Sequence, residues 1–250
     1  MDLDHHPTQE EITEFLLKNE GLGETTFRGF SKNTIVFLKN LSENNNKKWF
    51  DLHKQHYQDH VLNPLKSFVN DLAEWMLCID SDLEVRPEVG KTISRIYRDI
   101  RFSENKQPYK NSVWVVFKRP VTDWKDIPAF FFELSATGYR YGMGMYAATP
   151  KTMEQFRMKI DNDPEAFLSS VLFLSKQNTF QVAGDKYKKI RDKSIPDEIM
   201  DWYQRKNIYL VCENEINDRL FNKLLMDDML NGFGQLTPFY YYLWDVKLGR

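Results

Sequence analysis

The sequence predicts an α+β fold, with a mainly antiparallel sheet of about four to five strands packed with N-terminal and C-terminal helices. Three observations predict it. Apolar residues recur at three- and four-residue steps over the first third of the chain, as on the buried face of a helix. Segments rich in β-branched and aromatic residues follow, separated by Pro, Gly and Asp. After residue 149, cap residues that precede prolines signal helices again.

The N-terminal helices are expected between residues 31 and 78. Ser31 suits the N-cap of one helix, and Asn46, at the end of an Asn-Asn-Asn turn, suits the N-cap of the next. Pro64 is expected to be the first residue of a third helix. The inward faces are expected to hold Ile35, Phe37, Leu38, Leu41, Phe50, His53, Tyr57, Val61, Leu65, Phe68, Leu72 and Trp75.

Strands are expected next. The candidate segments are 93–102, 113–117, 129–134 and 139–146, and residues 207–213 can add a fifth. The Ala-Thr-Gly sequence at 136–138 predicts a hairpin turn in which Gly138 supplies a positive φ.

Helices are expected to complete the fold. Their start signals are Thr149-Pro150, Asp163-Pro164, Pro196, Asn217 and Thr237-Pro238. The last of these would open an aromatic terminal helix with three consecutive tyrosines at 240–242. Three neighbours cannot all be buried on one helix, so at least one is expected to meet solvent or a partner. Core packing and an oligomer contact are favoured over a stacking platform for nucleic-acid bases.

Residues 1–26 are expected to form an N-terminal appendage to a single α+β domain at 27–250, because no repeat, low-complexity tract or linker interrupts that range. The formal net charge of −2 predicts no general attraction to nucleic acid or to an anionic membrane. Cys78 and Cys212 lie far apart in apolar surroundings and are expected to be buried free thiols in a reducing compartment. With no signal peptide and no apolar run of the ~20 residues that span a bilayer, the expected location is the cytoplasm.

Positive charge is concentrated between residues 91 and 119. This segment holds two acidic residues, Asp99 and Glu104, against eight basic ones, a net charge of +6. The basic residues are Lys91, Arg95, Arg98, Arg101, Lys106, Lys110, Lys118 and Arg119.

If residues 93–102 form a strand, their side chains alternate between two faces. One face then presents Arg95, Tyr97, Asp99 and Arg101, and the other presents Ile96, Arg98, Ile100 and Phe102. Arg98 would be partly buried, and a buried guanidinium needs an anionic partner. Glu133 on the neighbouring segment is one candidate, and a ligand is the other.

Two interpretations of this segment stay open. In one, an Arg–Asp–Arg ladder only ties strands together, although surface ion pairs contribute only about 0–1 kcal/mol each. In the other, which we favour, the guanidiniums bind a small anionic or phosphorylated ligand, and a loop carrying Lys106, Tyr109 and Lys110 closes over it. If the site is catalytic, Asp99 or Glu133 could act as general base and Tyr109 as proton donor. A nucleic-acid or protein interaction module that uses the same basic face is a further alternative.

Two other patterns were weighed. His53, His56 and His60 share a helix face, but no Cys or carboxylate cluster completes a ligand set, so no metal site is expected. Gly142 and Gly144 lie within a strand pattern and match no nucleotide-binding fingerprint, so no cofactor is predicted. These glycines more simply mark a bulge or a close approach of the backbone to something bound.

The motif R-x-x-R-D-x-R-F-x-x-[DN]-K-x-x-Y is met at every fixed position. The matching residues are Arg95, Arg98, Asp99, Arg101, Phe102, Asn105, Lys106 and Tyr109. In this motif the chain resembles a family of uncharacterised bacterial proteins, with fungal relatives, known as a domain of unknown function. The segment NNNKKWF at 44–50 resembles a second element of that family. At 184–190 the chain has GDKYKKI where relatives often carry a basic-proline run. The resemblance implies a site near Arg95–Lys110 and no particular reaction.

Overall fold

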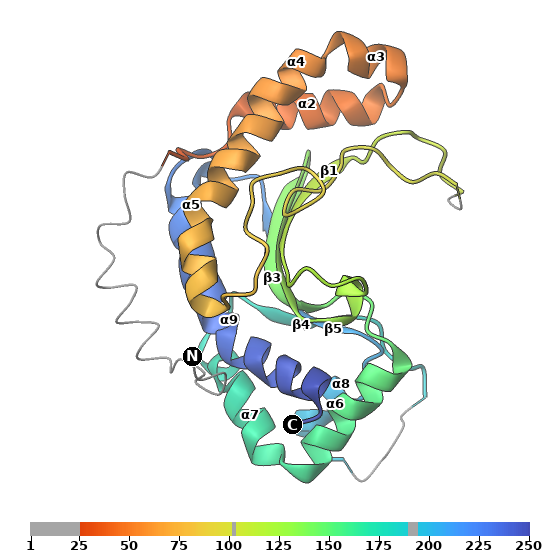
Figure 1. Cartoon of the computed structure of the whole chain (residues 1–250), viewed down its shortest axis with the longest axis vertical. Coiled ribbons are helices and arrows are strands. Elements are labelled where there is room, and N and C mark those ends of the chain that lie inside the picture. Colours follow the sequence, from red (N-terminus) through yellow and green to blue (C-terminus); the bar gives the residue numbers. More distant parts are fainter. Residues whose placement is uncertain (1–25, 102–103, 190–194) are drawn as a thin grey trace.

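A five-stranded antiparallel sheet with the strand order β1-β2-β3-β5-β4 forms the centre of the protein (Figure 1). The computed structural model describes residues 26–101, 104–189 and 195–250. The strands are β1 (Ser112–Phe117), β2 (Ala129–Ser135), β3 (Gly138–Met145), β4 (Gln181–Ala183) and β5 (Ile208–Glu215). The α+β class predicted from the sequence is confirmed, and the predicted appendage at 1–26 lies almost wholly outside the described residues.

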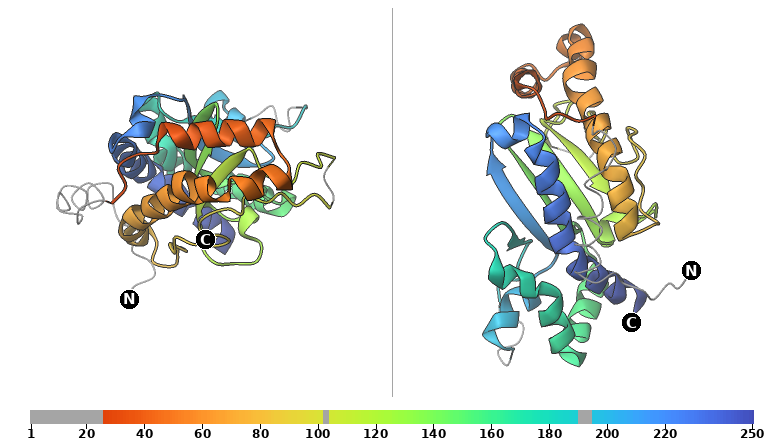
Figure 2. Two further views of the ribbon diagram at one scale, coloured as in Figure 1. Left: turned by 90° about the horizontal axis from the view of Figure 1, so that it is seen from above. Right: turned by 90° about the vertical axis from the view of Figure 1, so that its left-hand side faces the viewer.

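One face of the sheet forms the core together with α5 (Asn63–Ile79) and α9 (Leu224–Leu248), which lie side by side across it (Figure 2, right). Every second residue of each long strand points toward these helices. The buried strand residues on this face are Val113, Val115, Phe117, Phe130, Phe132, Leu134, Tyr139, Tyr141, Met143, Met145, Ile208, Leu210 and Cys212. We call the opposite side the open face, because among the described residues only loops and the short 3-10 turn η2 (Trp124–Asp126) lie over it (Figure 1).

The N-terminal helices begin where the sequence predicts. Helix α2 (Lys32–Glu43) is capped by Ser31, and α3 (Lys47–Leu52) is capped by Asn46. The next elements, α4 (Lys54–Tyr57), the π-helical turn η1 (Gln58–Leu62) and α5, follow one another without a break, and Pro64 lies in the first turn of α5. The hydroxyl of Thr34, a fully buried residue, donates to the carbonyl of His60 in η1 at 2.5 Å. A side chain from α2 thus bonds a carbonyl within the π-helical turn.

The C-terminal helices are α6 (Pro150–Asn162), α7 (Pro164–Val171) and α8 (Asp197–Tyr203), followed by α9. Thr149 and Asp163 cap α6 and α7 as predicted, with a proline in each first turn. Two 3-10 turns, η3 (Leu172–Lys176) and η4 (Asp218–Phe221), lie between the longer elements, and Asn217 caps η4.

Thr237-Pro238 does not open a helix, contrary to the prediction. It lies inside α9, where Pro238 cannot donate a backbone hydrogen bond. The Thr237 hydroxyl donates to the carbonyl of Phe233 at 2.9 Å. Tyr240 and Tyr242 are buried, and the half-buried Tyr241 donates its hydroxyl to the carbonyl of Ile79. These tyrosines fasten α9 to the core and form no stacking platform.

Three smaller expectations differ from the structure. Gly138 has no positive φ; it begins β3, where a Cβ would lie 2.5 Å from the carbonyl oxygen of Asn214 on β5. The short edge strand β4 was not predicted, because three residues give too little periodicity. Cys78 is exposed rather than buried, whereas Cys212 is buried, and both are free.

Among the described residues, no helix combines the length and the apolar character needed to cross a membrane.

The contact between α9 and β3 predicts an unusual effect of a Gly→Ala change. Alanine in a helix interior normally stabilises it by about 1 kcal/mol relative to glycine. At Gly232, however, a Cβ would lie 2.7 Å from Cε2 of Tyr141 and 3.1 Å from Cζ of Phe180. We therefore expect Gly232→Ala to lower the free energy of unfolding by about 1–3 kcal/mol in urea titrations.

The exposed Asn231 in the same helical turn provides the matched control. Asn231→Ala should leave stability unchanged or raise it slightly. Equal stabilisation by both alanines would show that α9 does not pack this closely on the sheet.

Candidate functional site

The basic segment predicted as a strand runs along the outer edge of β1. The backbone N–H groups of Ser94 and Val116 donate to the carbonyls of Trp114 and Thr92, each at 2.8 Å. Between these bonds the Trp114 N–H donates to the hydroxyl of Ser94 at 3.1 Å, and not to a backbone carbonyl. The pairing is thus interrupted, and the prediction of a continuous strand at 93–102 is wrong. The segment nevertheless extends the edge of the sheet.

The predicted alternation of side chains holds over most of this segment. The four residues assigned to the polar face are all exposed: Arg95, Tyr97, Asp99 and Arg101. On the other face Ile96 is buried and Arg98 is half-buried, as expected, but Ile100 is exposed. Phe102 lies outside the described residues.

Residues 97–101 and 104–109 form an arm that extends beyond the sheet (Figure 1). Tyr97 and Tyr109 pair at its base, and beside them the N–H of Arg98 donates to the carbonyl of Pro108 at 2.9 Å. The arm therefore leaves the sheet as a two-stranded ribbon.

Further out on the arm, the charged residues bond to one another and to the backbone. The Arg101 guanidinium donates to both carboxylate oxygens of Asp99, at 3.0 and 2.7 Å. Lys106 Nζ donates to the carbonyl of Ile100 at 3.1 Å. The bonds from Arg101 lower the pKa of Asp99 to about 2. So weak a base is poorly suited to accept a proton near neutral pH.

The base of the arm is fastened to the N-terminal helices by Asn45. Its side-chain oxygen accepts the N–H of Tyr109 at 3.0 Å, and its amide nitrogen donates to the carbonyl of the same residue at 3.0 Å. The amide also donates to the side chain of Asn111 at 2.9 Å. The ring of Phe50 stacks on the ring of Tyr109 with centroids 4.3 Å apart. Two segments singled out from the sequence, 44–50 and 95–110, thus contact each other through Asn45, Phe50 and Tyr109.

A groove of about 670 Å³ lies on the open face between the arm base and η2. Small-molecule sites typically have volumes of about 300–1,000 Å³, so this groove can hold a small ligand. Its wall along the β1 edge consists of Gly90, Lys91, Thr92, Ile93, Ser94, Arg95, Tyr97, Asp99 and Lys110. Its floor and far end consist of Trp114, Val116, Lys118, Trp124, Lys125, Ile127, Ala129, Phe131, Arg140, Gly144, Tyr146 and Tyr209.

The groove contains some of the residues singled out from the sequence. Of the six predicted to bind a ligand, Arg95 and Lys110 line it, and of the three suggested for catalysis only Asp99 does. The remaining predicted residues lie elsewhere: Arg98 beside the wall, Arg101 and Lys106 on the arm, Tyr109 in the core and Glu133 at a smaller cavity. Burial raises the pKa of the Tyr109 phenol, which has 1% of its surface exposed.

The strand register places an apolar row across the floor of the groove. Val116, Phe131, Gly142 and Val211 lie side by side on β1, β2, β3 and β5. The next row holds Trp114, Glu133, Arg140 and Glu213. Neither Trp114 nor Tyr209, nor Tyr146 after β3, was predicted to belong to a site. A signal was available in the sequence. The segments SVWVVF and AFFFELS carry apolar residues at positions that point to both faces of a strand, which indicates that the second face is apolar as well.

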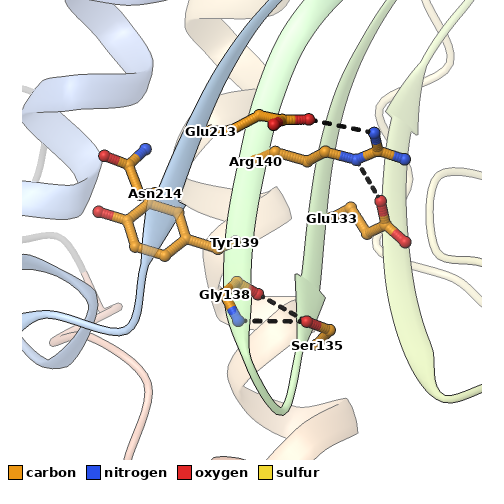
Figure 3. Close-up of a pocket in the computed structure, with 7 residues that line it drawn as sticks. All are labelled: Glu133, Ser135, Gly138, Tyr139, Arg140, Glu213 and Asn214. Atoms are coloured by element: carbon orange, nitrogen blue, oxygen red, sulfur yellow. Dashed lines mark hydrogen bonds and ion pairs between the residues drawn. The ribbon is translucent and has the colours of Figure 1, made fainter.

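The charged row forms an ion-pair network around Arg140 (Figure 3). The Arg140 guanidinium pairs with Glu133 at 2.5 Å and with Glu213 at 3.5 Å, and it lies 5.3 Å from the ring centroid of Trp114. Glu133 is therefore bound to Arg140 and is not the predicted partner of Arg98. This network borders a second cavity of about 220 Å³, which Ser135, Gly138, Tyr139 and Asn214 complete.

Arg95 and Lys110 line the arm end of the groove, and Arg98 lies near Lys110 beside the wall. Burial lowers the pKa of Lys110, and the neighbouring charges of Arg98 and Arg95 lower it further. Nε of Arg98 is buried and has no hydrogen-bond partner. Within the described part of the chain, no carboxylate pairs with any of the three. Arg95 is exposed, whereas Arg98 and Lys110 are half-buried. Partly buried cations without an anionic partner repel one another and lose solvation, so this cluster favours a bound anion.

More lysines lie toward the other end of the groove. Burial lowers the pKa of Lys118; the nearby Glu84 carboxylate opposes this effect, and the charge of Lys91 adds to it. The buried Glu84 carboxylate lies near both, but it is held by two hydrogen bonds from Arg86, which lower its pKa to about 2.

Asp126 fastens this far end of the groove. Its carboxylate accepts from the N–H of Thr149 at 2.6 Å, the hydroxyl of Thr152 at 2.9 Å and Nζ of Lys247 at 2.7 Å. The neighbouring carbonyl of Lys125 accepts the N–H of Ala147 at 2.9 Å. The loop carrying Trp124 is thereby held to α6 and α9.

The glycines of β3 make close contacts with β5. A Cβ on Gly142 would overlap the carbonyl oxygen of Leu210, and a Cβ on Gly144 would lie 2.4 Å from Cα of Tyr209. The predicted close approach of the backbone is therefore an approach to the adjacent strand. Because these two positions carry no side chain, the floor stays open, and Gly144 borders the groove.

The three histidines of the predicted row lie next to one another, with His53 between α3 and α4, His56 on α4 and His60 on η1. Ring centroids lie 5.8 Å apart for His53 and His56 and 5.9 Å apart for His56 and His60, and His53 stacks on Trp49 at 4.1 Å. In the parts of the chain that the structure describes, no group of three or more His, Cys, Asp or Glu residues could hold a metal ion.

With this geometry in hand, the chain can be compared with known proteins. The model of a family described as a conserved hypothetical protein (DUF2461) matches residues 33–242. The chain belongs to this family. No curated protein matches it. The matched range includes both the Asn45–Tyr109 contact and every residue of the groove wall and floor.

The contact between Asn45 and the arm predicts a stability effect at a distance. Asn45→Ala removes both bonds to the Tyr109 backbone and leaves its partly buried N–H and carbonyl without these partners. We expect the free energy of unfolding to fall by about 1–3 kcal/mol, and backbone amides of residues 97–109 to exchange faster with deuterium.

Asn40→Ala is the control, because Asn40 lies exposed on α2. It should change neither quantity appreciably. If Asn45→Ala destabilised the protein without faster exchange in the arm, the residue would stabilise the helices alone.

Proposed function

We propose that this protein binds a small anionic or phosphorylated ligand in the groove on the open face. The observation that carries the proposal is the cluster of Arg95, Arg98 and Lys110, three neighbouring cations for which no described carboxylate serves as partner. An anion at this end of the groove would offset the repulsion between them and bond to donors that are otherwise unused.

The shape of the groove supports the same conclusion. Six cationic side chains line it against one carboxylate, Asp99, and that carboxylate already pairs with Arg101. Of the six, Arg140 is paired with Glu133 and Glu213. The other five are Lys91, Arg95, Lys110, Lys118 and Lys125, which leave a strongly positive concave surface on a chain of net charge −2. A concave surface of one charge raises the local concentration of oppositely charged ligands.

The proposal keeps the site predicted from the family motif but shifts its centre. Arg95, Arg98 and Lys110 remain, with Lys91, Lys118 and Lys125 added. Arg101 and Lys106 lie on the arm and would reach the ligand only if the arm moved. The geometry supports binding and assigns no reaction. The cytoplasmic location predicted from the sequence remains part of this proposal.

A thermal-shift experiment with inorganic phosphate, pyrophosphate and dicarboxylates at low salt tests the proposal. A ligand at about 100 times its Kd adds about 2.7 kcal/mol of stability, which corresponds to a rise of about 5–10 °C in Tm for a chain of this size. We expect Arg95→Met and Lys110→Met to remove most of this rise, since each keeps an apolar stem and loses the charge.

Arg101→Met and Lys106→Met are the matched controls on the arm and should leave the rise intact. Loss of the response in the arm variants alone would place the anion at the arm instead of the groove. No rise with any anion would refute the proposal and leave the cation cluster as a structural feature.

The lowered pKa of Lys110 makes anion binding sensitive to alkaline pH. Only the protonated amine attracts an anion, and its pKa in the free protein lies below the ordinary 10.5. Affinity should therefore be highest near neutral pH and decline as pH rises through this lowered value. A bound anion raises the pKa of Lys110 again, so proton uptake accompanies binding on the alkaline side.

Sulfate is the suitable probe because its own charge does not change over this range. Calorimetric titrations from about pH 7 to about pH 10.5 should show the decline, and Lys110→Met should weaken binding at pH 7 and flatten the profile. An unchanged profile in Lys110→Met would assign the titration to another lysine, of which Lys118 is the foremost.

A further inference from the structure

The open face of the sheet carries aromatic rings at positions where polar residues are usual. In an antiparallel sheet with one face in the core, apolar and polar residues normally alternate along each strand, and the polar ones lie on the solvated face. Here that face and its borders carry Trp114, Phe131 and Tyr209 on the strands, with Trp124 and Tyr146 next to them. Contiguous apolar surface of this kind on a face open to solvent is typical of a binding site.

The rings on the floor of the groove are tilted against one another and do not form a closed stack. Phe131 lies 5.7 Å from Trp114 and 6.3 Å from Tyr209, measured between ring centroids, and Tyr146 lies 6.5 Å from Trp114. The interplanar angles are 42°, 77° and 69°, so no two of these rings lie parallel and in contact. Ring surface therefore remains for a planar group that enters the groove, and Tyr146 has 59% of its surface exposed.

Charge and aromatic surface occupy the same cavity. Arg95 and Lys110 line the wall while Trp114 and Phe131 form the floor beneath them. The backbone of Trp114 is bonded to Ser94, the residue before Arg95, so the ring and the guanidinium are held by adjoining parts of one edge. An inorganic anion would use the cations and leave the aromatic floor exposed.

We propose that the ligand is an anion built on a planar aromatic ring, with the ring against Trp114, Phe131 and Tyr146 and the anionic group at Arg95 and Lys110. This inference rests on the anion binding proposed above and specifies the rest of the ligand. A mononucleotide is the simplest probe, since every base has a flat face that stacks on aromatic side chains irrespective of its sequence identity.

The experiment compares four compounds by isothermal titration calorimetry at about 50 mM salt: adenosine 5′-monophosphate, ribose 5-phosphate, adenosine and inorganic phosphate. Stacking contributes about 1–3 kcal/mol per base, so the nucleotide should bind about 5- to 150-fold more tightly than ribose 5-phosphate. Tyr146→Ala and Trp114→Leu should each reduce this ratio and leave the affinity for ribose 5-phosphate unchanged.

Trp49→Leu is the control, because Trp49 lies on α3 outside the groove. It should leave the ratio unchanged. Circular dichroism and Tm would show whether Trp114→Leu disturbs folding. Tyr146 is exposed, so Tyr146→Ala tests the stacking of the ligand ring even if it does.

The possible outcomes distinguish the aromatic ligand inferred here from the anion binding proposed above. Equal affinities for the nucleotide and ribose 5-phosphate, both lost in Lys110→Met, would overturn the aromatic ligand and leave anion binding standing. No binding of any phosphate would overturn both. A single-stranded oligonucleotide that binds over about 100-fold more tightly than the nucleotide, with a steep dependence on salt, would overturn the small ligand in favour of a nucleic-acid surface.

Discussion

The packing of α5 and α9 on one face of the sheet fixes the rest of the structure. Because side chains alternate along a strand, burying Val115, Phe132 and Tyr141 under these helices commits their neighbours to the opposite side. A register slip of one residue would move the whole apolar set into solvent. The positions of Trp114, Phe131 and Arg140 on the open face are thus consequences of the core.

The groove depends on two loops that polar side chains fasten to other parts of the fold. At one end Asn45 binds the backbone of Tyr109, and at the other Asp126 binds Thr149, Thr152 and Lys247. Both fasteners are polar residues from outside the long strands. Since a site must be held rigidly to bind selectively, these contacts matter to the groove as much as the residues that line it.

Much of the fold followed from the sequence because its signals are local. Ser31, Asn46, Thr149 and Asp163 cap helices as predicted, and four of the five strands lie where β-branched and aromatic residues cluster. The misses have non-local causes. Pro238 lies within α9, a helix packed along its length against the core, and the segment 93–102 loses regular pairing where the Ser94 hydroxyl replaces a carbonyl. In the site, charge density located Arg95 and Lys110, whereas Tyr209 and Lys125 join them only through the strand order and the loop after β1.

The bond between Asn45 and Tyr109 joins residues 64 positions apart in the chain. Closing so long a loop costs conformational entropy before the contact returns any stabilisation, and contacts of this separation slow folding. Helix α2 and the caps at Ser31 and Asn46 depend only on near neighbours and can form early. The arm base can dock only after β1 and the N-terminal helices have come together. The wall of the groove is therefore complete only in a chain in which β1 and the N-terminal helices have already taken their native places.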